Sequence, residues 1–352
     1  MSKTMNAVIY EEYGDPEVLR YVEDFPAPEP GPGEALVEVH AVGLNGYDLM
    51  ARSGRYKPNR GQFPHILGGD FSGVLRALGP DARTDLAPGT RVTAWWIVTC
   101  GVCDQCLSGH HNRCALDYRY LGAHLRGAYA QYVTLPALNL VALPDTLGYE
   151  EAAAFPNAFG TAWHMLMVRA GLQAGETVLV NSASSGVSMA AIQIAKLAGA
   201  YVCATSSAEW KLGKAKELGA DETINYNDRD FTDEIMARTG KRGVDVVVEH
   251  VGGDFLDKSV RCLTRGGRLV TVGGTKSYDC EIQVNYVFHK ELSIIGSNGS
   301  TKRDLEATMS FLADGRLKCV IDRVFPLREA VDAHRYLESG QQFGKVVLAI
   351  DH

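Results

Sequence analysis

Four cysteines, Cys100, Cys103, Cys106 and Cys114, lie within fifteen positions of a glycine-containing stretch. Thiolates at this spacing can wrap around zinc as a tetrahedron, with Zn–S distances of about 2.3 Å. Four cysteine ligands close the coordination sphere and leave no place for water or substrate. We therefore predict one structural zinc ion per chain. The other four cysteines are scattered, and we expect them to be small buried residues.

A second stretch, Asn181-Ser-Ala-Ser-Ser-Gly-Val-Ser188, follows the apolar run Thr177-Val-Leu-Val180 and precedes a helical pattern. A turn from a strand into a helix can hold a pyrophosphate, because backbone N–H groups and the helix dipole face the anion. Only one glycine remains of the glycine-rich centre that such turns usually have, and small serines take the other places. We predict dinucleotide contacts from Ser184, Ser185, Gly186 and Val187.

The next strand is expected to end in Ala204-Thr-Ser-Ser-Ala-Glu-Trp-Lys211, about twenty residues beyond this loop. An acidic residue at the strand end would bind a free ribose 2′-hydroxyl, whereas hydroxyl groups and a cation suit a 2′-phosphate. Glu209 is the nearest acid, but it falls in the first turn of the expected helix, where the helix dipole favours acids. The sequence predicts NADP(H), with Ser206, Ser207 and Lys211 on the phosphate.

Two kinds of pattern must position these motifs. Up to about residue 150 the chain has short strands and turns, such as the alternating stretch 34–43, which indicates a β-rich domain. From about residue 151, apolar strands at 177–180, 201–204, 244–248 and 268–272 are interleaved with helices near 187–198 and 208–218. That alternation predicts an α/β domain with a parallel sheet covered on both faces. After about residue 315 the pattern is β-rich again and could return to the first domain.

The composition excludes several classes of protein. A chain of 352 residues is long enough for about two domains, and a net charge of -7 argues against nucleic acid or an anionic membrane as partner. A small-molecule substrate is the better expectation. The sequence shows no run of 18 apolar residues and no signal-peptide pattern, so we expect a cytoplasmic protein.

The cysteine cluster, the loop Ala183–Ser188, the pair Asn225-Tyr226 and the closing Gly344-Lys-Val-Val-Leu together resemble the medium-chain dehydrogenase/reductase superfamily, from about residue 5 to 350. The resemblance implies a GroES-like catalytic domain, residues 1–150 and 315–352 with a zinc lobe at 100–114, and a doubly wound Rossmann NADP-binding domain, residues 151–314. It also implies a homodimer or homotetramer. Further cofactor contacts are expected from Thr161, Tyr226, Gly273, Gly274 and Lys345.

Zinc-dependent alcohol dehydrogenases of this superfamily hold a second, catalytic zinc. At the corresponding positions this sequence has Asn45, Gly69 and Asn157, which cannot rebuild that site, and Asp70 alone would not hold the ion. The pattern around these residues instead resembles zinc-independent quinone oxidoreductases and enoyl reductases. Those relatives commonly lack the cysteine lobe, so the chain combines features of two branches.

Without a Lewis acid, reduction of an isolated ketone is difficult, whereas hydride addition to an enone spreads the charge into an enolate that a few donors can hold. Asn45 and Asn157 are the candidate donors on the carbonyl side. The resemblance nominates Tyr56 as the proton donor, with Tyr47 as the rival acid. Trp96 and Tyr120 fall where related dehydrogenases line the substrate pocket.

These residues favour an NADPH-dependent reductase of activated C=C bonds or quinones. Two alternatives stay open: a zinc-free alcohol or aldehyde dehydrogenase that works through one of the tyrosines, and a nucleotide-binding protein without catalysis.

Overall fold

The computed structural model describes residues 3–59 and 61–352. The chain divides into two compact units: the first runs to Asn157 and resumes at Thr301, and the second is Ala158–Ser300. The sequence patterns placed the boundaries at 150/151 and 314/315. The difference arises because helix α3 (Tyr149–Ala154) packs on strands of the first unit and because Lys302 of helix α10 (Lys302–Ala313) donates to the Leu138 carbonyl. In the described part of the chain, no helix is both long and apolar enough to cross a bilayer.

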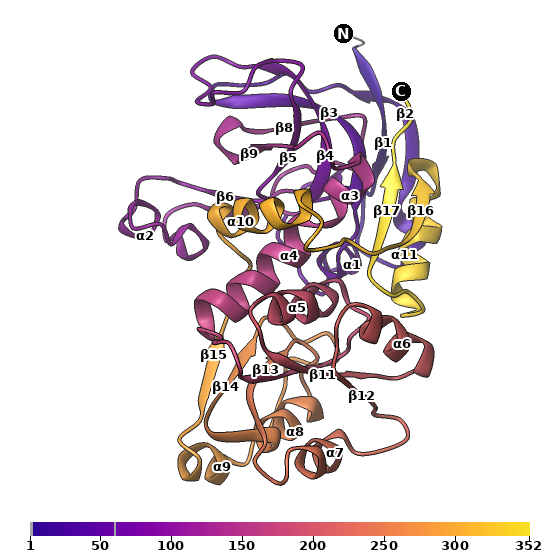
Figure 1. The fold of residues 1–352 in the computed structure, drawn as a ribbon. Helices are drawn as coiled ribbons and strands as arrows, with labels where there is room; N and C mark the ends of the chain where they lie inside the picture. The colour runs from indigo at the N-terminus through magenta and orange to yellow at the C-terminus, as the bar shows by residue number, and fades with distance from the viewer. Residues whose placement is uncertain (1–2, 60) are drawn as a thin grey trace. The chain divides into compact units, whose positions relative to one another are not determined.

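A seven-stranded sheet forms the centre of the first unit, in the order β16-β17-β3-β4-β5-β9, with β8 paired to β3. Its strands are β3 (Glu34–Gly43), β4 (Asp70–Leu78), β5 (Arg91–Ala94), β8 (Tyr132–Pro136), β9 (Leu140–Ala142), β16 (Ile321–Pro326) and β17 (Lys345–Ala349). Strand β17 pairs antiparallel with β3, so the C-terminal segment does return to the first unit. In Figure 1 the yellow β17 accordingly lies beside indigo strands from the start of the chain.

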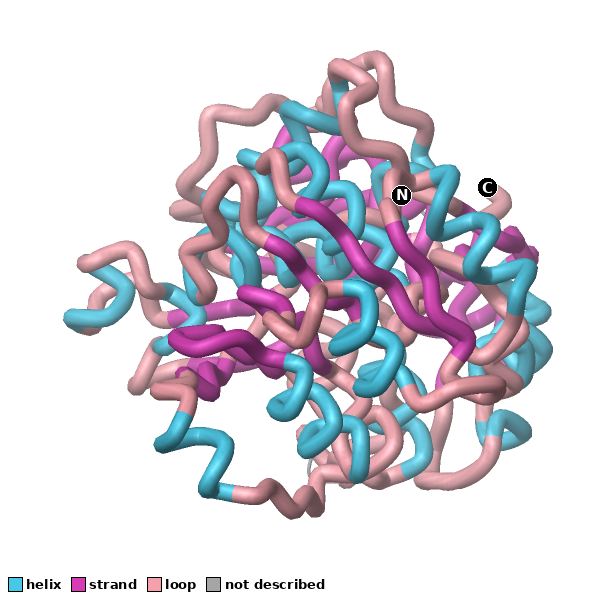
Figure 2. The backbone as a smooth tube through the Cα atoms, turned by 60° about the horizontal axis from the view of Figure 1, so that its bottom comes forward, coloured by secondary structure: helices cyan, strands magenta, loops and turns pink. Residues whose placement is uncertain are grey.

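Two smaller strand pairs complete this unit. They are β1 (Thr4–Ile9) with β2 (Arg20–Pro26), and β6 (Ile97–Thr99) with β7 (Tyr118–Tyr120). Its remaining helices are α1 (Gly46–Ser53), α2 (Asp104–Leu107) and α11 (Ala330–Glu338), with short 3-10 turns at 16–18, 111–113, 137–139 and 327–329. Helix α2 belongs to a mostly irregular loop, at the left of Figures 1 and 2, that projects from the pair β6-β7.

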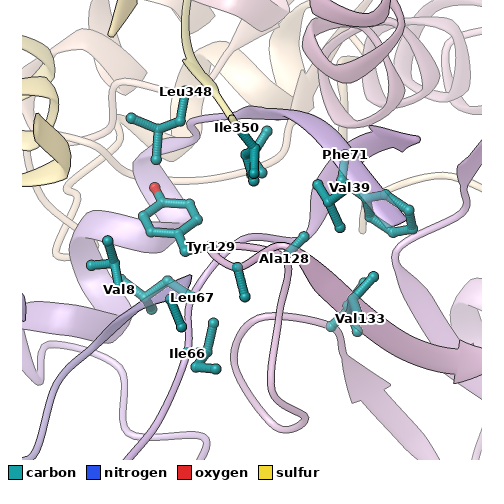
Figure 3. Close-up of a cluster of buried hydrophobic side chains, with 14 of the residues drawn as sticks. Val8, Val39, Ile66, Leu67, Phe71, Ala128, Tyr129, Val133, Leu348 and Ile350 are labelled. Atoms are coloured by element: carbon teal, nitrogen blue, oxygen red, sulfur yellow. The ribbon is translucent and has the colours of Figure 1, made fainter. Parts of the chain in front are cut away.

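The core of the first unit gathers side chains from distant parts of the sequence, as Figure 3 shows. The labelled members are Val8, Val39, Ile66, Leu67, Phe71, Ala128, Tyr129, Val133, Leu348 and Ile350, and all belong to one buried cluster. Strand β3 contributes through alternation, since Val37 and Val39 are fully buried whereas Glu38 and His40 are half-buried. The alternation expected for 34–43 is thus present, and it leaves a polar pair on the other face of β3.

The second unit is a doubly wound α/β domain. Its six-stranded parallel sheet has the order β12-β11-β10-β13-β14-β15. The strands are β10 (Thr177–Val180), β11 (Tyr201–Ser206), β12 (Glu222–Asn225), β13 (Val244–Glu249), β14 (Leu263–Thr271) and β15 (Ser293–Gly296). The helices are α5 (Gly186–Leu197), α6 (Glu209–Glu217), α7 (Phe231–Arg238), α8 (Asp254–Cys262) and α9 (Val284–His289), preceded by α4 (Pro156–Trp163) and a π-helical turn at 164–169. The predicted fold class is confirmed.

Candidate active site

Five aromatic side chains of the first unit form one continuous cluster, although they come from four separate segments. Tyr47 lies centrally, with its ring centroid 5.7 Å from Tyr56, 5.7 Å from Trp96 and 5.3 Å from Tyr120. Trp96 and Tyr120 are 4.5 Å apart, and His124 is 5.3 Å from Tyr120. Both tyrosines and both pocket aromatics named from the sequence therefore come together. Aromatic faces of this kind suit a flat, conjugated ligand.

His124 was not among the predicted site residues, yet its contacts define its tautomer. The backbone N–H of Tyr120 donates to His124 Nδ1 at 2.9 Å, so in the neutral imidazole Nδ1 is the acceptor and the proton is on Nε2. Nε2 lies 3.4 Å from the Tyr56 hydroxyl. His124 is then the donor in that contact, and the phenol oxygen of Tyr56 accepts. This leaves the Tyr56 proton directed elsewhere.

The loop that carries His124 is held in place by a close approach between the backbones of Gly122 and Gly68. Gly122 has a φ of 78°, and a Cβ there would lie 2.6 Å from the backbone nitrogen of Gly68. Only glycine fits such a position without strain. The chain just after β7 is thereby held against the segment that leads into β4.

Two buried donors in the aromatic cluster lack a partner. Among the described residues, neither the Tyr47 hydroxyl nor Trp96 Nε1 has a hydrogen-bond partner, although both atoms are shielded from solvent. Leaving a buried donor unsatisfied costs about 1–3 kcal/mol, so such groups commonly mark a place where a ligand binds. Burial, and next the neighbouring Tyr56, raises the pKa of Tyr47, which keeps its hydroxyl protonated as a donor.

Asn45 contacts both members of a buried ion pair, Lys345 and Asp70. Lys345 Nζ donates to Asn45 Oδ1 at 2.6 Å and to the Leu44 carbonyl at 2.7 Å, while Asn45 Nδ2 donates to Asp70 Oδ2 at 3.0 Å. The Lys345 ammonium is 3.8 Å from the same Asp70 oxygen. The Asn45 amide thus bridges a buried cation and a buried anion, and its role as a donor to a substrate carbonyl stays a prediction.

Asn157 and Asp48 extend this network. The Asn157 backbone N–H donates to Asp70 Oδ2 at 3.2 Å, whereas Asp48 accepts from the backbone N–H groups of Asn45 at 2.8 Å and Gly68 at 3.2 Å. Burial raises the pKa of Asp48 to about 7 and also raises that of Asp70, against the opposing effect of Lys345. Burial lowers the pKa of Lys345, and Asp70 opposes this.

The residues in place of the catalytic zinc ligands do not fit a metal ion. Asn45 and the Asn157 backbone both donate to Asp70, and the Lys345 ammonium lies against Asn45 and Asp70, where it opposes a bound cation. Within residues 3–59 and 61–352, only two clusters have metal-ligand geometry: the four cysteines, and Glu38 with His40 and His352. Lys345 bonds to Leu44, Asn45 and Asp70 of the first unit. Its predicted contact with the cofactor stays a prediction.

The four cysteines are arranged as zinc ligands would be. Their sulfur atoms all lie within 4.8 Å of one another. Cys100 Sγ is 3.9 Å from Cys106 Sγ and 3.4 Å from Cys114 Sγ, and Cys103 Sγ is 3.9 Å from Cys114 Sγ. A tetrahedron with Zn–S bonds of about 2.3 Å has edges of about 3.8 Å. Hydrogen bonds, of which the one with the Ala115 backbone has the largest effect, lower the pKa of Cys103 to about 6. This favours the thiolate, the form that binds zinc.

The candidate nucleotide loop of the second unit leads into α5 as predicted. Ser185 is the N-cap of the helix, and its hydroxyl accepts from the Ser188 N–H at 3.0 Å. Ser188, at the place of the third glycine, donates to the Asn181 carbonyl at 2.7 Å and contacts His250 Nε2 at 2.7 Å. A serine is accommodated there because its hydroxyl joins this buried network. His250 is a further residue that the sequence patterns did not reveal.

The residues proposed for the 2′-phosphate lie together at the end of β11. Ser206 is the last residue of the strand and is buried, and Ser207 follows it. Lys211 reaches back to the loop, where its Nζ donates to Ser184 Oγ at 3.3 Å. Ser184 and Lys211 are therefore neighbours despite their separation in sequence. Gly186 and Val187 form the first turn of α5.

The other predicted cofactor residues of this unit are more scattered. Thr161 is buried on α4. Gly273 and Gly274 follow β14, and a Cβ on Gly274 would lie 2.5 Å from the Ser277 carbonyl oxygen, so that turn requires glycine. Tyr226 packs edge-on against Phe255 at 5.2 Å, as part of the core. Their contacts with a cofactor stay predictions.

Comparison with known proteins agrees with this geometry. A family model for the alcohol dehydrogenase GroES-like domain matches residues 31–145, and one for zinc-binding dehydrogenase matches residues 186–314. Quinone oxidoreductase of Pongo abelii is 31% identical over 99% of this chain and 98% of its own length. The chain belongs to the medium-chain dehydrogenase/reductase superfamily.

Other members of the superfamily differ in their named activities. Acryloyl-coenzyme A reductase of Metallosphaera sedula is 30% identical, over 98% of this chain and 99% of its own. The solved structure of an NAD-dependent alcohol dehydrogenase is 43% identical, with a TM-score of 0.93 and coverage of 99% and 100%. A 2-octenoyl-CoA carboxylase reductase, CinF, solved with NADP and 2-octenoyl-CoA, is 26% identical with a TM-score of 0.90 and coverage of 99% and 88%. The protein is an oxidoreductase of this superfamily.

Proposed function

We propose that this protein is an NADPH-dependent reductase of activated C=C bonds, such as those of enones and enoyl compounds, or of quinones, and that it works without a catalytic metal. The observation that carries the proposal is the aromatic cluster, in which Tyr47 Oη and Trp96 Nε1 are buried without a hydrogen-bond partner among the described residues. A lysine network stands where zinc-dependent relatives have metal ligands. The names of the quinone oxidoreductase and acryloyl-coenzyme A reductase relatives support the same substrate class.

Reduction of a conjugated acceptor requires only two chemical tasks of the protein residues. NADPH, when bound, supplies a hydride to the β-carbon of the acceptor. The residues then have to hold the negative charge that develops on the carbonyl oxygen and deliver a proton to the α-carbon. Tyr47 and Trp96 are donors of the right type for the oxygen, because each hydrogen currently lacks an acceptor among the described residues.

Tyr56 is the proposed proton donor. Its phenol oxygen accepts from His124 Nε2, so its own proton is available to a substrate. A donor bond to the oxygen also stabilises the phenolate that remains after transfer. Burial raises the pKa of Tyr56 in this structure, so the group is protonated at neutral pH before the reaction.

Cofactor choice is proposed from the end of β11. Ser206, Ser207 and the buried cation Lys211 suit a 2′-phosphate, and CinF was solved with NADP. The 43% identical structure is named as NAD-dependent, so a direct comparison of NADPH with NADH binding decides the cofactor.

We also propose one structural zinc held by the four cysteines of the lobe, since the spacing of their sulfur atoms fits the ion.

The deciding experiment follows NADPH oxidation with a panel of enones, enoyl thioesters, quinones and aldehydes. We expect turnover with conjugated acceptors and little with isolated aldehydes. Tyr56→Phe should lower turnover on an enone by about 100-fold or more with NADPH affinity unchanged. If Tyr47→Phe alone is damaging, Tyr47 is the acid; if both variants keep full turnover, water supplies the proton and this assignment is wrong.

One second function has specific support. The alcohol dehydrogenase named among the similar structures favours a zinc-free alcohol or aldehyde dehydrogenase acting through a tyrosine. Turnover of alcohols with NADP+ or NAD+, and none of enones, would establish it. Absence of any turnover together with nucleotide binding would instead indicate a non-catalytic protein.

We further propose that copies of the chain assemble through the second unit, as a homodimer or homotetramer. Strand β15 is an edge strand that exposes Ile294, and α9, which precedes it in the chain, exposes Val284 and Phe288. Such an edge offers unpaired backbone groups and apolar side chains to another strand. Ile294→Lys should shift the protein to monomers in analytical ultracentrifugation.

We also propose that the protein is located in the cytoplasm, because four closely spaced thiols suit a reducing compartment.

A further inference from the structure

Strand β3 presents two metal-binding side chains on the face opposite to its core side chains. Glu38 and His40 are two positions apart and therefore project from the same face of the strand. Val39, between them, points into the hydrophobic cluster in Figure 3. His40 is held in place by stacking on Tyr149, with ring centroids 4.3 Å apart and planes at 11°.

The C-terminal segment brings a third such side chain to the same face. The Ile350 N–H donates to the His40 carbonyl at 3.0 Å, and Gln131 Nε2 donates to the Asp351 carbonyl at 2.9 Å. The first bond ties the residues after β17 to β3, and the second ties them to the residue that precedes β8. The His352 ring consequently lies 4.9 Å from the His40 ring.

The ligand atoms have the spacing and lone pairs that a metal ion requires. One atom from each of Glu38, His40 and His352 lies within 4.8 Å of the others. Glu38 Oε1 and His40 Nε2 are 3.4 Å apart, and two ligands about 2.0–2.1 Å from one tetrahedral ion are separated by about 3.4 Å. His40 Nε2 is buried without a hydrogen-bond partner among the described residues.

The orientation of His352 agrees with a ligand role. Its Nε2 lies 2.8 Å from the Val39 carbonyl, which can only accept, so Nε2 donates and carries the proton. Nδ1 then keeps its lone pair. Metal-binding histidines typically have their second ring nitrogen fixed by such a carbonyl.

We propose that Glu38, His40 and His352 form a second metal site, separate from the cysteine lobe, for a divalent transition ion such as Zn²⁺ or Ni²⁺. Two imidazoles and one carboxylate are the donor set that such ions prefer. The bound ion would fasten the C-terminal segment to β3. Arg76 competes for the site, because it pairs with Glu38 Oε1, the oxygen nearest to His40.

The experiment titrates the zinc-loaded chain of 352 residues with Ni²⁺ by isothermal calorimetry, after weakly held metal has been removed by dialysis. We expect one Ni²⁺ per chain. His40→Ala and His352→Ala should each weaken this binding by at least about 10-fold to 100-fold, the loss seen even for partners outside the ligand set. His289→Ala is the matched control, since His289 is an exposed histidine of the second unit, and it should bind as wild type does.

The variant Arg76→Ala is expected to change the Ni²⁺ affinity in the opposite direction to the histidine variants, and poor folding would not increase the affinity. Removing the competing cation should tighten Ni²⁺ binding. Nickel binding that survives both histidine substitutions, its absence from the wild-type protein, or weaker binding to Arg76→Ala would each overturn the proposal.

Discussion

Removal of Lys345 tests most directly whether a buried ion pair organises the centre of the site. Its Nζ atom is 3.8 Å from Asp70 Oδ2, which at an effective dielectric constant of about 20 corresponds to roughly 4 kcal/mol of attraction. Lys345→Met keeps most of the side-chain volume but leaves a buried carboxylate unpaired. It also removes the donor to Asn45 Oδ1 and the Leu44 carbonyl. We expect the free energy of unfolding to fall by about 3–5 kcal/mol.

Two further variants separate this effect from simple truncation. Lys345→Met combined with Asp70→Asn removes both charges and should recover part of the loss, because no unpaired charge remains buried. Lys196→Met is the control: Lys196 pairs with Asp221 at 2.8 Å while partly exposed, so its loss should cost about 1 kcal/mol or less. Urea unfolding followed by circular dichroism measures all three. A loss at Lys345 no larger than at Lys196, or no recovery in the double variant, would refute the reasoning.

The same variant has a predictable dependence on pH. Burial raises the pKa of Asp70, and Lys345 holds that rise in check. Without Lys345 the pKa of Asp70 in the folded state rises further above its unfolded value. A raised folded-state pKa contributes stability below the unfolded value and loses it as pH rises through the folded value. The deficit of Lys345→Met relative to wild type should therefore grow as the pH rises above the unfolded-state pKa of Asp70.

Three other predictions concern separate parts of the molecule. Metal analysis of the purified protein should find one tightly held zinc per chain, and Cys114→Ser should abolish it and lower the melting temperature; zinc retained by that variant would contradict the lobe assignment. Lys211→Ala should weaken NADPH binding by roughly 1–3 kcal/mol with little change for NADH, and equal losses for both cofactors would refute the 2′-phosphate assignment. His124→Phe should lower kcat on an enone and change its pH profile while leaving the melting temperature nearly unchanged, whereas an unaltered profile would mean that His124 only packs beside Tyr56.

Periodic patterns predicted the fold well because each depends on neighbouring residues. The strand expected at 177–180 is β10, and the helix expected near 187–198 is α5 at Gly186–Leu197. The cysteine lobe was equally local, with all four ligands in one loop. The boundary near 314 was less accurate, since the assignment of α10 to the first unit depends on tertiary contacts such as that of Lys302 with Leu138.

The chemistry of the site was predicted less completely, because it depends on partners far apart in the sequence. No sequence pattern links Asn45 to Lys345, 300 positions later, whose ammonium donates to Asn45 Oδ1. His124 was not predicted as a site residue, since no pattern links it to Tyr56, 68 positions earlier. Tyr47, by contrast, was named as the rival acid, and its unpartnered hydroxyl gives it a definite candidate role.

The position of the cysteine lobe gives the proposed structural zinc a role near the aromatic cluster. The lobe is the connection between β6 and β7, and in that pair Ile97 is opposite Tyr120 and Thr99 is opposite Tyr118. Trp96 directly precedes β6, and Tyr120 is the last residue of β7. The two strands that lead into and out of the lobe therefore also position both of these aromatic side chains. An ion that clamps the lobe thus reduces the freedom of Trp96 and Tyr120 from the far end of the same strands. Loss of the zinc should therefore raise the KM for a conjugated substrate more than it lowers the affinity for NADPH.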